Sequence, residues 1–109
     1  MLSFLIGGAV SLKSQVTIGS LDPPKATLDV VAAKTDGTTA EGIIAPRLTL
    51  AQLKSADAQY TSNQKGAIVF VTDTTGTTKT KTAAVAAVGY YFFDETKWQP
   101  FASNNSSNG

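Results

Sequence analysis

Two short runs of strand-forming residues are apolar at nearly every position, and they constrain the fold more than any other feature of the sequence. Residues 67–72 read AIVFVT and residues 90–93 read YYFF. Because successive side chains of a strand point to opposite faces, Tyr90 and Phe92 are predicted to lie on one face and the other two residues on the opposite face. A strand that is apolar on both faces needs cover on both. One face is therefore predicted to enter the core, and the other needs a further layer.

The remaining pattern predicts a mainly β architecture with antiparallel strands, hairpins and one short helix near residues 50–55. Strands are expected at residues 16–18, 26–33, 67–72 and 85–94, with residues 97–102 returning as the second strand of a hairpin. Pro100 cannot donate a main-chain hydrogen bond, so this returning strand is expected at an edge of the sheet.

The helix has a clear start signal. Thr49 is followed three residues later by Gln52, which is the spacing of a capping box. Leu48 and Leu53 flank this start as a hydrophobic staple. A helix of residues 50–55 is too short to be stable alone, so its leucines are expected to pack against the rest of the chain.

The composition excludes several common kinds of catalytic and metal-binding site. The chain has no cysteine and no histidine, which removes disulfides, thiol nucleophiles, common zinc sites and histidine-based triads. With nine basic and eight acidic residues, its net charge is +1 and no basic stripe is present to bind nucleic acid. We therefore expect no catalytic residues, no metal ligands, no cofactor and no enzyme activity.

The two ends differ from the middle of the chain. Residues 1–14 contain an apolar run of the length of a signal-peptide core, so we predict a truncated signal peptide that is cleaved near Ser14. A buried N-terminal strand or helix is the alternative. Because the predicted signal peptide directs export, the mature chain is expected to be extracellular or at the cell surface. The apolar run is too short to cross a bilayer, so no membrane span is expected in the mature chain. Residues 15–103 are predicted as the β-rich module, and residues 104–109 as an Asn/Ser/Gly-rich linker.

An ordered series of short motifs resembles a known kind of module. The motifs lie at residues 26–30 (ATLDV), 42–53 (GIIAPRLTLAQL), 64–73 (QKGAIVFVTD), 89–94 (GYYFFD) and 98–99 (WQ). The series resembles a module of secreted Bacteroidetes surface proteins and is similar to shaft modules of bacteriophage tail fibres and adhesins. The resemblance implies an exported, often trimeric, β-rich module that links or presents other parts and has no catalytic activity.

Within these motifs, five residues are predicted to have structural roles: Pro46, Arg47, Thr49, Gln52 and Gly66. Pro46 restricts the backbone, and Gly66 is expected to begin a strand where a side chain does not fit. The guanidinium of Arg47 suits a bridge to carbonyls or to a carboxylate of another strand or chain; an ordinary solvated arginine is the alternative.

The aromatic cluster is the main candidate for binding. It consists of Tyr90, Tyr91, Phe92, Phe93 and Trp98. Its members are predicted to serve the core and a subunit interface. The alternative is a module that binds carbohydrate or a host surface, with these rings as a platform for surface glycans. A chain of this size without disulfides buries little surface by itself, so a homo-oligomer is expected. The resemblance to fibre modules implies three copies, in particular an intertwined trimer. The alternatives are a monomeric two-layer sandwich and an accessory domain of a hydrolase.

A modification site is also predicted. Residues 73–75 (DTT) resemble the short acidic-threonine signal for O-glycosylation in exported Bacteroidetes proteins, which points to Thr74.

Overall fold

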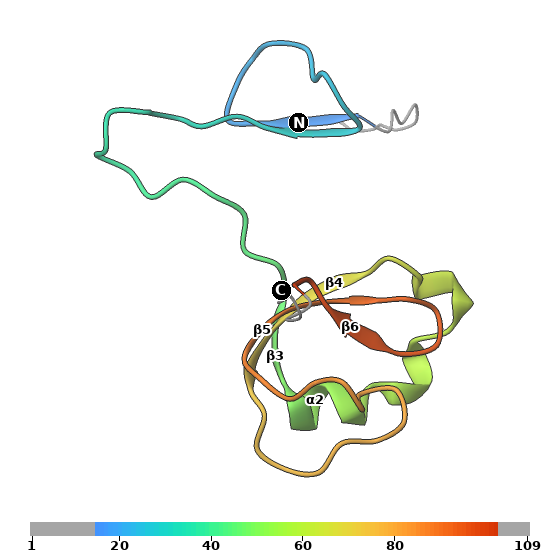
Figure 1. The fold of residues 1–109 in the computed structure, drawn as a ribbon. Helices are drawn as coiled ribbons and strands as arrows, with labels where there is room; N and C mark the ends of the chain where they lie inside the picture. The colour runs from blue at the N-terminus through green and yellow to red at the C-terminus, as the bar shows by residue number, and fades with distance from the viewer. Residues whose placement is uncertain (1–14, 103–109) are drawn as a thin grey trace, which may run out of the picture. The chain divides into compact units, whose positions relative to one another are not determined.

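The computed structural model describes residues 15–102, which form two compact units that divide between Ile43 and Ile44 (Figure 1). The predicted signal peptide, residues 1–14, and the predicted linker, residues 104–109, lie outside the described residues. Each unit is described by itself.

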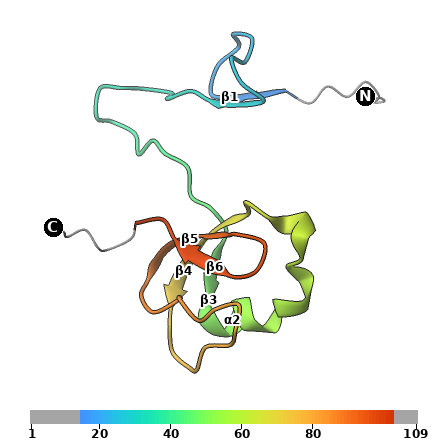
Figure 2. The ribbon, with the colours of Figure 1, turned by 45° about the vertical axis from the view of Figure 1, so that its right-hand side comes forward.

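The first unit contains a two-stranded parallel sheet of β1 (Val16–Ile18) and β2 (Leu28–Val30) (Figure 2). Main-chain hydrogen bonds continue the pairing at both ends, from Val16 N to Thr27 O and from Val31 N to Ile18 O, each 2.7 Å long. The sequence pattern predicted antiparallel pairing, but residues 19–27 carry the chain back to the start of β1 instead of reversing it tightly. This connection is shorter than the dozen or so residues that parallel strands usually need.

The second unit is a four-stranded sheet with one short α-helix. Its elements are β3 (Arg47–Thr49), α2 (Leu50–Ser55), the 3₁₀ turns η1 (Asp57–Gln59) and η2 (Ser62–Gln64), β4 (Ile68–Asp73), β5 (Gly89–Phe93) and β6 (Trp98–Pro100). The strand order is β3-β4-β5-β6, in which β3 and β4 are parallel and the other pairs are antiparallel. The prediction of a mainly β fold with one short helix is confirmed, and so is the hairpin with β6 at the edge.

Strand β3 was not predicted, because three residues after a proline give no alternating pattern. Its pairing begins where the carbonyl of Pro46 accepts a hydrogen bond from Phe70 N at 2.9 Å. Residues 50–67 then carry the chain through α2 and both 3₁₀ turns before β4 starts. A crossover of this length permits parallel pairing, which the expectation of antiparallel strands had missed.

The helix starts where the sequence predicts. Gln52 N donates to Thr49 Oγ1 at 3.1 Å, and Thr49 N donates to Gln52 Oε1 at 2.9 Å, so the capping box is complete. The same spacing recurs at Thr61 and Gln64, where a second capping box begins η2. The sequence shows the same spacing at residues 61–64, where no helical turn was predicted.

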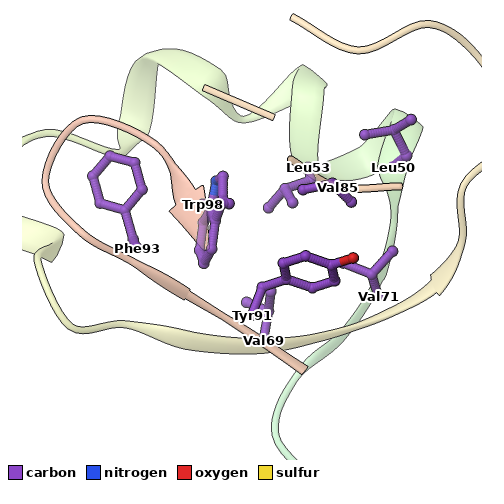
Figure 3. Packing of buried hydrophobic residues seen from close by; sticks show 8 residues of the cluster. All are labelled: Leu50, Leu53, Val69, Val71, Val85, Tyr91, Phe93 and Trp98. Atoms are coloured by element: carbon purple, nitrogen blue, oxygen red, sulfur yellow. The ribbon is translucent and has the colours of Figure 1, made fainter. Parts of the chain in front are cut away.

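The core of the second unit lies between one face of its sheet and α2 (Figure 3). Eight hydrophobic side chains are buried there: Leu50, Leu53, Val69, Val71, Val85, Tyr91, Phe93 and Trp98. The hydroxyl of Tyr91 donates to the carbonyl of Ala87 at 2.7 Å, which satisfies its polar end inside the core. Lys81 Nζ donates to the carbonyl oxygens of Asp57, the first residue of η1, and of Tyr60, which follows η1, at 2.8 and 2.7 Å.

Candidate functional site

The sheet of the second unit covers the core with one face only, and its other face carries exposed apolar side chains. Because Phe70 pairs with Tyr90 and Ile68 with Phe92 across β4 and β5, these side chains share one side of the sheet. Phe101, which follows β6, completes this group. We call this set of five residues the outer face: Ile68, Phe70, Tyr90, Phe92 and Phe101.

The outer face is both exposed and fixed in geometry. Ile68 is 46% exposed, Tyr90 36% and Phe101 56%. The ring of Tyr90 lies 4.8 Å from that of Phe70, edge-on, and 5.7 Å from that of Phe101, while Phe92 and Phe101 are 6.1 Å apart. These centroid distances are those of favourable aromatic pairs. A hollow of about 380 Å³ opens beside them, lined by Gly66, Ile68, Phe92 and Phe101.

The structure divides the predicted aromatic cluster into two groups. Tyr91, Phe93 and Trp98 are at most 3% exposed, because they point between the sheet and α2. Their inclusion in a binding surface is therefore corrected: they form the core. Tyr90 and Phe92 lie on the outer face, as the alternation of a strand predicts.

Three outer-face residues were missed as members of the candidate surface. Ile68 and Phe70 alternate with the buried Val69 and Val71, so the sequence held the signal for their shared side. Phe101 lies beyond β6 and is held on this surface by the hydrogen bond from its N–H to Tyr90 O and by its ring contacts with Tyr90 and Phe92.

Arg47 stands at the border of the outer face. It pairs with Phe70 across β3 and β4, whereas the next residue, Leu48, pairs with the buried Val71 and packs against the core. Arg47 is exposed, and within residues 15–102 its guanidinium makes no hydrogen bond or ion pair. Its five donors are therefore available to a carbonyl or carboxylate of another chain. That bridge stays a prediction.

At the turn of the β5–β6 hairpin, the carboxylate of Asp94 accepts hydrogen bonds from polar groups that lie beside Phe92. The side chain of Gln99, which pairs with Phe92, donates to Asp94 Oδ2 at 2.9 Å, and the N–H groups of Thr96 and Lys97 both donate to Oδ1 at 2.8 Å. These hydrogen bonds, that of Gln99 first, hold the pKa of the Asp94 carboxyl far below its ordinary value of 3.8.

The remaining predicted residues lie elsewhere. Gly66 has φ +94°, and a side chain placed there would meet nothing within 4 Å, so its backbone conformation and not lack of room requires glycine. Thr74 is half-buried in the loop after β4, next to Asp73. Its O-glycosylation stays a prediction.

The part of the chain that the structure describes shows no grouping of acidic side chains that could hold a metal ion. Among the same residues, no helix has the length and apolar character that crossing a membrane requires.

The second unit thus presents a small β sheet with one face packed on the core and an apolar outer face without charged side chains. Comparison with protein families is more specific: the family described as "Phage tail like trimerisation region" matches residues 17–109. The match covers 93 of the 109 residues, and the chain belongs to this family. It confirms the resemblance to phage tail-fibre modules. No curated protein and no solved structure matches the chain.

Proposed function

We propose that this protein is a homotrimeric structural module in which the outer faces of three copies pack against one another. The observation that carries the proposal is the outer face itself: five apolar side chains without charge on one side of the sheet, of which the four aromatic rings contact one another. Contiguous apolar surface of this kind on a soluble domain marks an interaction site. The description of the family supports trimerisation as the interaction that this surface makes.

The same patch can serve in every copy. A closed three-fold arrangement uses one surface repeatedly, and three sheets that face a common axis cover one another without leaving an open end. Arg47 at the border of the face is then placed to bridge to the main chain or a carboxylate of the next copy, outside the apolar centre.

The experiment compares one charge at two places. Ile68→Glu puts a carboxylate into the outer face, and Ala51→Glu puts the same group on the exposed side of α2. Light scattering should give three chains for the wild type and for Ala51→Glu, but one chain for Ile68→Glu. The fluorescence of Trp98, which is 1% exposed in the core, should stay native in all three proteins, because Ile68 is 46% exposed and outside the core.

A wild-type protein that is monomeric at micromolar concentration would refute the proposal. A trimer that tolerates Ile68→Glu would place the interface elsewhere. The glycan platform would instead require a folded wild-type monomer whose sugar binding is lost in Ile68→Glu.

We propose further that the trimer works as a connecting or presenting part of a phage-tail-like fibre or of an exported surface protein. The family description and the resemblance to fibre shafts support this role. The predicted export is tested by N-terminal sequencing of protein expressed from the complete gene, which should begin near Gln15. An intact N-terminus together with recovery in the cytoplasm would overturn the predicted location.

A further inference from the structure

The two-stranded sheet of the first unit has one apolar and one polar face. Val16 pairs with Leu28 and Ile18 with Val30, so these four aliphatic side chains lie on one side of the sheet. We call them the apolar strand face. The pair Thr17 and Asp29 points to the other side, where Asp29 Oδ2 accepts a hydrogen bond from Lys25 N at 2.9 Å.

The apolar strand face is uncovered. Its four side chains are between 37% and 55% exposed: Val16, Ile18, Leu28 and Val30. None of residues 15–43 is buried. A two-stranded sheet is at best marginally stable in water without an apolar face packed on another layer. The strands therefore need an occupant for this face to persist.

We infer that the occupant is the same face of two other copies of this chain, so that each trimer contains a second, N-terminal core of six strands. This inference rests on the proposed trimer. The family match supports it, because the trimerisation region starts at residue 17 and thus includes β2 and all of β1 except Val16. The chemistry of the face also supports it: four aliphatic side chains without charge or hydrogen-bonding groups are complementary to themselves.

Gly19 fixes the geometry that presents this face. Its φ is +90°, and a Cβ at this position would lie 2.1 Å from the carbonyl oxygen of Val31, inside any tolerable contact. Only glycine allows the chain to leave β1 this close to the end of β2. The pairing of the two strands is thus built into the first unit, although its own side chains provide no core.

Hydrogen exchange read by mass spectrometry tests the inference on the full chain. The amides of residues 16–18 and 28–30 should exchange on the order of 100-fold more slowly in the wild-type trimer than in the Ile68→Glu monomer, because only the trimer covers them. Strands that exchange rapidly in a protein shown to be trimeric would overturn the inference and leave the proposed trimer standing. Equal protection in trimer and monomer would also overturn it, since the face would then be covered within its own chain. A monomeric wild type is a failure of the proposed function and is recognised by its mass.

Two serine variants provide a matched pair that does not depend on Ile68→Glu. Val30→Ser removes an aliphatic group from the apolar strand face, and Leu21→Ser removes one from the fully exposed loop of the same unit. Val30→Ser should abolish the slow exchange of both strands and promote dissociation on dilution, whereas Leu21→Ser should leave both unchanged. Equal behaviour of the two variants would refute a core built from the apolar strand face.

Discussion

Removing the cap of α2 should weaken the whole second unit, because the cap holds the helix that supplies two core residues. Thr49→Ala removes the acceptor of Gln52 N, a hydrogen bond of 3.1 Å, and leaves an early helical N–H without a partner. The loss of an N-cap side chain costs about 1 kcal/mol. Leu50 and Leu53 are 1% and 0% exposed, so the first turn cannot fray without opening the core, and the cost should appear in global unfolding.

The assay is urea unfolding followed by the fluorescence of Trp98, the only tryptophan, which is 1% exposed. All proteins are compared at one concentration, since assembly shifts apparent stability. Thr49→Ala should lower the free energy of unfolding by about 1 kcal/mol, or the melting temperature by about 4–8 °C. Thr49→Ser keeps the acceptor and should match the wild type. An alanine variant as stable as the wild type would show that the cap does not support the core.

Three further changes test contacts in the second unit. The depressed pKa of Asp94 means that its contribution to stability is present above the ordinary value of 3.8 and is lost as the pH falls below it. Asp94→Asn should therefore reduce the fall in the free energy of unfolding that urea melts measure as the pH is lowered from 6 to 2. The same fall in the variant and the wild type would contradict the role of the bonds from Gln99 and the turn to Asp94. Lys81→Met should lower the free energy of unfolding by about 1–3 kcal/mol, because it leaves two carbonyls without their charged donor. The control Lys65→Met breaks only an exposed ion pair of 3.5 Å and should lower it by less than about 1 kcal/mol. Equal losses of stability in thermal melts of the two variants would contradict this difference. Tyr91→Phe should cost about 1 kcal/mol by removing the hydroxyl that bonds Ala87, and a variant as stable as the wild type would show that this bond contributes nothing net.

The sequence by itself determined the features that depend on near neighbours in the chain. The capping box joins Thr49 to a residue three positions away, so spacing alone located the helix. The hairpin of β5 and β6 joins strands through a short turn, and the alternation of residues 90–93 fixed which of them share a side. Composition alone excluded disulfides and histidine chemistry.

Only the tertiary structure decided the features that depend on pairing between distant segments. Alternation cannot say which side of a strand is covered; the burial of Tyr91 and Phe93 under α2 made Tyr90 and Phe92 the outer face. The parallel pairs β1–β2 and β3–β4 arise from the path of the connections, to which no local pattern corresponds. Phe101 joined the outer face for the same reason, because its place follows from a main-chain bond across the sheet. Contacts of this kind depend on the packing of the whole unit, so the spacing of residues in the sequence could not predict them.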